Sequence, residues 1–290
     1  MNYSVSQLCE LHEYRKVYRL MSTEEKIHIK ACSGAGHTWV TVLPLSFKRY
    51  NMTSAMWRTS VLKRLRQDVV RVERQCTFCK WCRGDLKGEH AIMCSGGCSR
   101  TLRHNTVRDL IAKAVRDLGY RTDIEHGGGL GDQRRPGDVI VFNWREGKHL
   151  LIDVAVINPL CVSHADDLVK DGVGGAATAY ETVKKNTYPD IDFSVYDFLP
   201  FIVESCGGIG EAAIGLCKEL EDQREAKEYW KNKWDGGWNL RKFPDPLLTA
   251  INIEVQRFNS RMILERQPPS SDLIETSFIK CEAEVAREER

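Results

Sequence analysis

Two stretches of the sequence decide the fold: RRPGDVIV at residues 134–141 and LLIDVAV at residues 150–156. Each is rich in the β-branched and aliphatic residues that favour strands, and each contains one acid. The polar residues between them, NWREGK at 143–148, include a glycine, so we expect an antiparallel hairpin over residues 138–157. The hairpin would bring Asp138 and Asp153 to one end of the same sheet.

Two carboxylates in neighbouring buried strands are costly unless a cation lies between them. Hard divalent cations prefer oxygen ligands, so Asp138 and Asp153 are predicted to bind Mg²⁺ or Mn²⁺. An ordinary acid at a strand edge is the alternative for either residue alone. Glu125, on the strand expected just before the hairpin, is a candidate third carboxylate. Glu204 is either a further acid of this site or simply the end of a strand.

Composition and charge limit the class of protein. The chain has 290 residues, of which 42% are hydrophobic and 28% charged, as in globular proteins. Its apolar runs are too short to span a membrane, and residues 1–30 are charged throughout, so we expect an intracellular protein without a membrane partner. Residues 1–122 hold 22 Lys and Arg against 10 Asp and Glu, whereas residues 123–290 hold 20 against 30. A basic front half favours a polyanionic partner, although solvated surfaces would also explain the charge.

The fold class predicted from periodicity is α/β (α+β), with a mixed sheet flanked by helices in the central order αβββαβα. Basic helices and a small Cys/His segment would precede this core. Helices are expected at 5–30, 53–72, 102–118, 174–186, 211–232 and 247–264, and strands at 38–45, 120–125, 138–157 (the hairpin) and 197–204.

The Cys/His segment has the spacing C-x2-C-x10-H-x3-C at Cys76, Cys79, His90 and Cys94. Two thiolates from a tight turn, followed by an imidazole and a thiolate from the next turn, are typical of a tetrahedral zinc site. Four protein ligands leave no open position, so the zinc is predicted to be structural. Cys82 and Cys98 are alternatives to Cys94 as the fourth ligand, and free buried thiols are the alternative to a metal site.

The order of several motifs resembles the C-terminal region of non-LTR-type retroelement polyproteins, in which a Cys/His knuckle and a restriction-endonuclease-like domain follow a reverse transcriptase. A Tyr-x-Asp-Asp polymerase motif does not occur, so we expect the reverse transcriptase to be a separate partner or an upstream part of a longer chain. Besides the Cys/His segment, the motifs are SGAGxxW at 33–39, RHNxVRD at 103–109, RPGDV at 135–139, IDVAV at 152–156, VExxGG at 203–208 and QRFNSR at 256–261.

The resemblance implies a PD-(D/E)xK nuclease that uses Mg²⁺ or Mn²⁺ to nick target DNA, so that the reverse transcriptase can prime from the 3′ hydroxyl. Asp138 and Asp153 match the two acids of that motif. The position of the motif lysine, two residues after the second acid, is occupied here by Ala155. Related retroelement enzymes supply this lysine from the following helix, where Lys184 fits and Lys185 is the alternative.

The resemblance also implies DNA as the partner, with RNA as the alternative, and a nuclear location. We expect a helical basic region at 1–72, the zinc knuckle at 73–100, the nuclease domain at 101–232, a connector and helix at 233–266 and a polar tail at 267–290. The residues predicted to contact nucleic acid are Arg83, Lys87, Arg103, His104, Arg108, Arg134 and Arg135.

Two other classes of function stay open at this point. The first is a non-catalytic nucleic-acid-binding module that keeps the zinc and the fold, which Ala155 at the usual lysine position favours. The second is a zinc-stabilised interaction scaffold whose acids are only structural.

Overall fold

The computed structural model describes residues 5–33, 38–41, 51–124, 137–161, 174–188, 191–226 and 246–267. Within these ranges, helices surround one mixed sheet of four strands. The helices are α1 (Val5–Leu20), α2 (Thr23–Ala31), α3 (Thr38–Thr41), α4 (Ser54–Arg64), α5 (Glu89–Met93), α6 (Ser99–Asp117), α8 (Gly175–Thr187), α9 (Glu211–Ala226) and α10 (Pro246–Leu264), and the strands are β1 (Thr122–Ile124), β2 (Val139–Arg145), β3 (Lys148–Ile157) and β4 (Tyr196–Glu204).

The strands lie in the order β1-β2-β3-β4 across the sheet. The β1–β2 and β2–β3 pairs are antiparallel, whereas β3 and β4 are parallel, and α8 lies in the connection between those two strands. The predicted mixed sheet and its hairpin are therefore confirmed. The hairpin turn is tight because Glu146 and Gly147 both adopt positive φ angles, 48° and 79°, as a two-residue primed turn requires.

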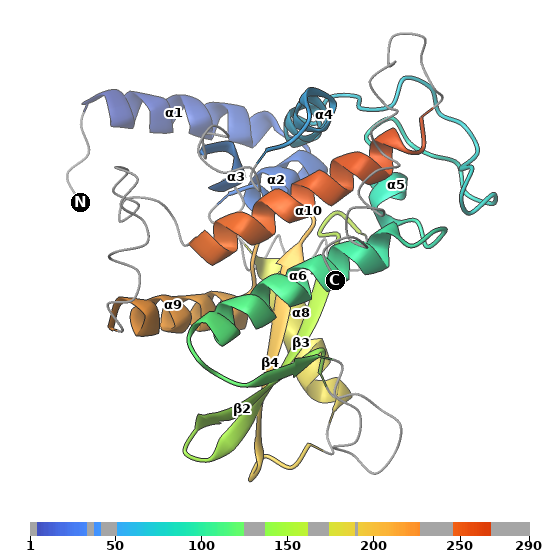
Figure 1. Cartoon of the computed structure of the whole chain (residues 1–290). Helices are drawn as coiled ribbons and strands as arrows, with labels where there is room; N and C mark the ends of the chain where they lie inside the picture. The colour runs from blue at the N-terminus through green and yellow to red at the C-terminus, as the bar shows by residue number, and fades with distance from the viewer. Residues whose placement is uncertain are drawn as a thin grey trace.

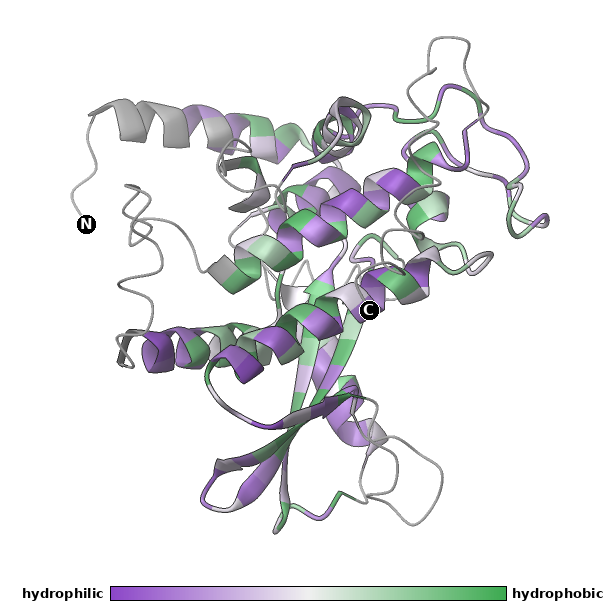
Figure 2. Cartoon of the chain, in the orientation of Figure 1, coloured by the Kyte–Doolittle hydropathy of each residue, from purple (hydrophilic) through white to green (hydrophobic). Residues whose placement is uncertain are grey.

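The alternation of side chains along β3 gives the sheet two covered faces. Leu150, Ile152 and Val154 pack in one cluster with residues of α6, α9 and the first half of α10. Ile157 points to the opposite face and packs with α8 and α2. Figure 1 shows this layered arrangement, and in Figure 2 the central strands are hydrophobic whereas the tip of the hairpin is hydrophilic. Asp153 has the same parity as Ile157, so it lies on the α8 face.

Helix α10 joins the layers through buried polar side chains. The side-chain amides of Gln256 and Asn259 both donate to the Ser205 carbonyl, just beyond β4, at 3.0 and 2.8 Å. The hydroxyls of Ser60 on α4 and Ser260 lie 2.6 Å apart. These bonds hold α4 and the end of β4 against the same helix.

The N-terminal region differs from its prediction in two places. Residues 5–30 form two helices instead of one, because Ser22 and Glu25 form a capping box that starts α2. The strand predicted at 38–45 is wrong where the structure describes it, since Thr38–Thr41 is helical.

The helix predicted at 53–72 is capped by Thr53 but ends at Arg64. Arg66 has a φ of 55°, which turns the chain out of the helix, and Val69 then packs with Ile92 and Ile263. Val69 therefore belongs to the contact with α5 and α10, not to a longer helix.

The helices predicted at 102–118, 174–186 and 247–264 are confirmed as α6, α8 and α10. The helix predicted at 211–232 is confirmed as α9 up to residue 226. Its predicted end, the connector at 233–245 and the tail from residue 268 onward lie outside the described residues.

Candidate active site and metal centre

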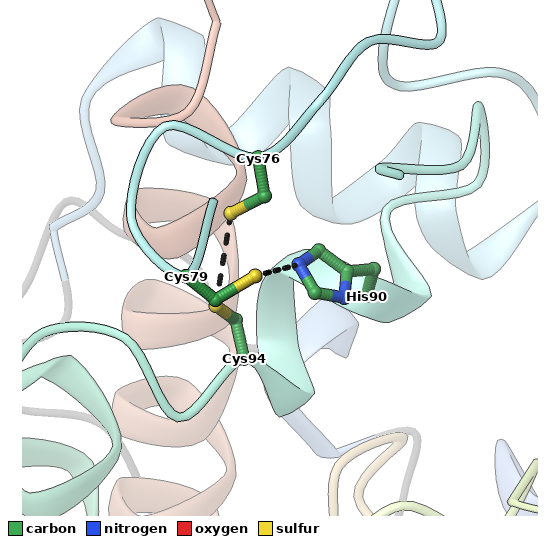
Figure 3. A group of neighbouring side chains, drawn as sticks. All are labelled: Cys76, Cys79, His90 and Cys94. Atoms are coloured by element: carbon green, nitrogen blue, oxygen red, sulfur yellow. Dashed lines mark hydrogen bonds between the residues drawn. The ribbon is translucent and has the colours of Figure 1, made fainter. Parts of the chain in front are cut away.

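The predicted zinc ligands Cys76, Cys79, His90 and Cys94 are brought together, with their ligand atoms all within 4.8 Å of one another. Figure 3 shows the three sulfurs and the imidazole converging on one point. Cys94 occupies the fourth position, whereas Cys98 is exposed, and Cys82 lies beside the cluster. The cluster could therefore hold a metal ion such as zinc.

The spacing within the cluster fits a tetrahedral ion. The sulfurs of Cys76 and Cys94 are 3.7 Å apart, and Cys79 Sγ is 3.5 Å from His90 Nε2. Zinc–sulfur bonds of about 2.3 Å and zinc–nitrogen bonds of about 2.0 Å at tetrahedral angles place ligand atoms about 3.8 Å (S···S) and about 3.5 Å (S···N) apart.

Backbone amides also favour the thiolate form that a metal requires. Burial opposes ionisation of Cys79, but the N–H groups of Cys82 and Trp81 outweigh it and lower the pKa of this thiol to about 7. Hydrogen bonds from the backbone of Cys79 and Phe78 likewise lower the pKa of Cys76 against the opposing effect of burial. The turn thus presents two sulfurs to which its own amides donate.

The C-terminal end of α10 holds this segment in place. Arg266 donates to the Gly96 carbonyl at 3.1 Å and lies over the Phe78 ring at 4.2 Å. A side chain at Gly96 would overlap the backbone of Phe78 and Cys79, so the two metal-binding turns pack directly against each other. At the other end, the Asp85 carboxylate accepts from the first two amides of α5, which carries His90.

The second group of predicted residues meets at the start of β2. Val139 pairs with Ile152, so Asp138 and Asp153 are the next residues along the two strands. Asp153 is 6% exposed, and Asp138 is partly buried. The structure therefore brings together the two acids that the sequence placed at one end of the hairpin.

The two carboxylates have different surroundings. Burial opposes ionisation of Asp138, but hydrogen bonds from His104 Nε2 (3.2 Å) and the Val154 amide (2.7 Å) hold its pKa below the usual value. Burial raises the pKa of Asp153, and the negative charge of Asp138 raises it further. Asp138 is thus stabilised as the anion, whereas Asp153 depends on a neighbouring cation.

That cation is Lys184, whose Nζ lies 2.9 Å from Asp153 Oδ2. Burial opposes the charge of Lys184, but Asp153 outweighs it and raises the pKa of the amine. Lys185 is exposed. Of the two candidate lysines, Lys184, the preferred one, is therefore the residue that reaches Asp153. Glu125 lies outside the described residues.

Buried carboxylates fix the position of the helix that carries Lys184. Glu204 accepts from the Ala177 amide in the first turn of α8 at 3.1 Å, and burial raises its pKa to about 7. Glu181 accepts from the Ala212 amide in the first turn of α9 at 3.0 Å. Glu204 therefore ends β4 and caps the first turn of α8. Within the described part of the chain, no contact with Asp138 or Asp153 is seen that would support Glu204 as a further acid of the site.

The acid pair fits a divalent cation in its charge. Two carboxylates face the single positive charge of Lys184, whose Nζ lies 2.9 Å from Asp153 Oδ2. A further cation would balance the remaining negative charge. Asp138 and Asp153 are the residues that would hold it.

A groove of about 530 Å³ leads from the Cys/His segment to His104. Its walls are residues 92–97 of the Cys/His segment, residues 100–104 of α6 and residues 154–158 of β3. Ala155 and Tyr180 also line it, so the small side chain at the usual lysine position leaves the groove open. Arg100, which the sequence analysis missed, is exposed on this wall.

Two of the residues predicted to contact nucleic acid are buried. Arg103 is 4% exposed and donates to Asn259 Oδ1 at 2.5 Å, and its burial lowers its pKa to about 10. Arg108 is 8% exposed and bonds to Asp109. Helical spacing turns both side chains inward, and Arg103 joins α6 to α10.

The other predicted contacts differ in how accessible they are. Arg83 has a side chain that is 74% exposed, 3.6 Å from Glu73. The Lys87 ammonium forms an ion pair with Asp68 at 2.7 Å and donates a hydrogen bond to the Arg66 carbonyl at 2.6 Å. His104 faces the acid pair, and Arg134 and Arg135 lie outside the described residues.

A second buried cluster, His28, Cys32 and Cys206, was not foreseen. The spacing of His28 and Cys32, four residues apart on a helix, is a local signal that could have indicated half of it. Cys206 lies 178 residues from His28 along the chain, so its position comes only from the fold.

Among the described helices, none combines the length and the apolar character needed to cross a lipid bilayer. The chain gives no match to protein-family models and no significant match to curated protein sequences. The geometry described above therefore carries the functional interpretation.

Proposed function

We propose that this chain is a divalent-metal-dependent DNA endonuclease with a restriction-endonuclease-like core and a structural zinc knuckle. The observation that carries the proposal is the convergence of Asp138, Asp153 and Lys184 at one end of a mixed sheet with the order α-β-β-β-α-β. Two acids from a hairpin and a lysine over the second acid are the residue types that phosphodiester hydrolysis by a PD-(D/E)xK nuclease needs.

Each residue has a distinct role in the proposed reaction. A Mg²⁺ or Mn²⁺ ion held by Asp138 and Asp153 would polarise the scissile phosphate and lower the pKa of the attacking water. Lys184 is close enough to the acid pair to orient that water by donating a hydrogen bond. His104 donates to Asp138 and keeps its second oxygen on the Val154 amide, so it positions this ligand.

The path of the nucleic acid follows from the groove. It runs from the Cys/His segment to His104, which donates to Asp138, and Arg100 offers an exposed cation on its wall. Arg83 extends the basic surface onto the knuckle. Phosphate contacts of this kind position a duplex without reading its sequence. We therefore assign the knuckle to DNA placement and the hairpin to cleavage, with RNA as the alternative substrate.

The biological role follows from the resemblance of the motifs. The chain would nick one strand of target DNA in the nucleus, and a partner reverse transcriptase would extend the resulting 3′ hydroxyl. Zinc at Cys76, Cys79, His90 and Cys94 would hold the knuckle folded.

A supercoiled-plasmid nicking assay with Mg²⁺ or Mn²⁺ tests the proposal. Asp153→Asn and Lys184→Ala should each reduce nicking by about 100-fold or more, as expected for loss of a metal ligand or of a proton-transfer group. Lys185→Ala is the matched control, because Lys185 is the exposed neighbour on the same helix. Nicking that is equal in all four proteins would refute the proposal.

The second candidate is a nucleic-acid-binding module without catalysis. The ion pair between Lys184 and Asp153 favours it, since a satisfied acid pair can be purely structural. Binding of a DNA duplex by the wild-type chain, without cleavage under any divalent cation, would favour this candidate over the nuclease.

A further inference from the structure

Helix α2 and the turn after β4 place three metal-ligating side chains together in the interior. His28, Cys32 and Cys206 are 2%, 8% and 5% exposed, and their ligand atoms all lie within 4.8 Å of one another. None of the three belongs to the Cys/His segment or to the acid pair.

The hydrogen bonding of His28 leaves one ring nitrogen available. Nε2 lies 2.9 Å from the Arg64 carbonyl, which can only accept, so this nitrogen carries the hydrogen; it also lies 3.5 Å from Cys32 Sγ. Nδ1 then keeps its lone pair and faces Cys206 Sγ at 4.0 Å. A ring N–H that donates to a backbone carbonyl is the usual support of a histidine that binds a metal through its other nitrogen.

The remaining space fits one small ligand. A cavity of about 10 Å³ adjoins the three side chains, and Ser205 and Gln256 also line it. This volume is about that of one water molecule. Lys63 and Arg64 also line the cavity, and Arg64 donates to the Cys32 carbonyl at 3.0 Å.

We propose that His28, Cys32 and Cys206 form a second zinc site, with water as the fourth ligand. Two thiolates and a neutral imidazole suit Zn²⁺ and give a complex without net charge, which tolerates burial. Three protein ligands with one open position also occur in catalytic zinc sites, but the cavity here is too small and too buried to admit a substrate. The ion would instead be structural.

The proposed ion would join three parts of the fold. His28 lies in α2 and Cys32 caps its C-terminus, the Arg64 carbonyl that orients His28 ends α4, and Cys206 follows β4. The backbone carbonyl of the adjacent residue, Ser205, accepts hydrogen bonds from the side-chain amides of Gln256 and Asn259 on α10. Zinc at this point would therefore fix the N-terminal helices to the sheet.

The test is the zinc content of the full chain, purified under reducing conditions without chelators and measured by elemental analysis. Wild type should contain two zinc ions per chain. Cys206→Ala and His28→Gln should each contain one, and Cys76→Ala, which breaks the predicted knuckle, should also contain one. Cys217→Ala is the control, because Cys217 is equally buried outside both clusters, and it should keep two.

Cobalt substitution provides a readout that does not depend on stability. Co²⁺ in the wild-type chain should give thiolate charge-transfer absorption from two sites, and Cys206→Ala should lose only the weaker, two-thiolate share. One zinc per wild-type chain, or full zinc content in both Cys206→Ala and His28→Gln, would overturn the proposal. A Cys32–Cys206 disulfide in the chain as purified would overturn it as well.

Discussion

Replacing Lys184 by Met tests whether the acid pair is a cation site. The ammonium lies 2.9 Å from Asp153 Oδ2, and the two side chains are 20% and 8% exposed. Removing one member of a fully buried ion pair costs about 3–5 kcal/mol, and the partial exposure of Lys184 reduces this to about 2 kcal/mol. The loss arises because the Asp153 carboxylate would stay buried and repelled by Asp138, with no neighbouring positive charge to compensate.

The same variant should respond more strongly to divalent cations. Mg²⁺ replaces the missing ammonium, and a ligand at 100 times its dissociation constant stabilises the folded state by about 2.7 kcal/mol. In wild type the ion must compete with Lys184, so its effect is smaller. Millimolar Mg²⁺ should therefore remove most of the stability difference between the two proteins.

Urea unfolding of the zinc-loaded chains, with and without Mg²⁺, measures both effects. Lys185→Met should change the free energy of unfolding by less than about 0.5 kcal/mol, as usual for an exposed side chain. In an Asp153→Asn background, Lys184→Met should destabilise the fold much less, because the negative charge that Lys184 compensates is absent. A destabilisation of Lys184→Met that Mg²⁺ leaves unchanged would refute the cation site and leave a structural ion pair.

Four further outcomes are expected. Asn259→Ala should lower the free energy of unfolding by about 3 kcal/mol in urea titrations, because it leaves the buried Arg103 guanidinium without its acceptor; no loss would contradict the structural role of this arginine. Cys79→Ser should remove the knuckle zinc and the protection of residues 76–98 from proteolysis, since zinc binding and folding are coupled in such segments; unchanged cleavage would show that this turn folds without metal. Arg83→Ala should weaken binding of a DNA duplex equally for all sequences and reduce the slope of log K against log salt by about 1, and a sequence-selective loss would contradict a phosphate contact. Gly210→Ala should destabilise the fold by about 1–3 kcal/mol, because the added methyl would overlap the Glu181 carboxylate that caps α9; calorimetry measures this, and a neutral effect would mean that the cap can move.

Local signals predicted the centre of the fold. The hairpin followed from strand composition and a polar turn, and α8 followed from a helical repeat whose face also contains Lys184. Such patterns depend on neighbours in sequence, so the residues themselves specify them. The spacing of Cys76, Cys79, His90 and Cys94 belongs to the same kind of signal, because a tight turn limits which side chains can meet.

Long-range packing limited the remaining predictions. Arg103 and Arg108 share α6 with His104. Nothing in their charge indicates that both arginines are buried, Arg103 against Asn259 of α10, whereas His104 faces the acids. The His28, Cys32 and Cys206 cluster depends on the contact of α2 with the end of β4. Charge alone predicts an exposed arginine, whereas partners such as Asn259 decide its burial.

The knuckle and the acid pair are physically continuous through α6. Cys94 ends the metal-binding segment, and α6 starts a few residues later at Ser99, with His104 in its second turn. His104 in turn donates to Asp138, so one helix links the Cys/His turn to a carboxylate of the acid pair. Arg103, one residue earlier, ties the same turn to α10, and Arg266, two residues past the end of α10, donates to Gly96 of the Cys/His segment. These contacts form a closed set, so the burial of Arg103 helps to fix the helix that positions His104 against Asp138.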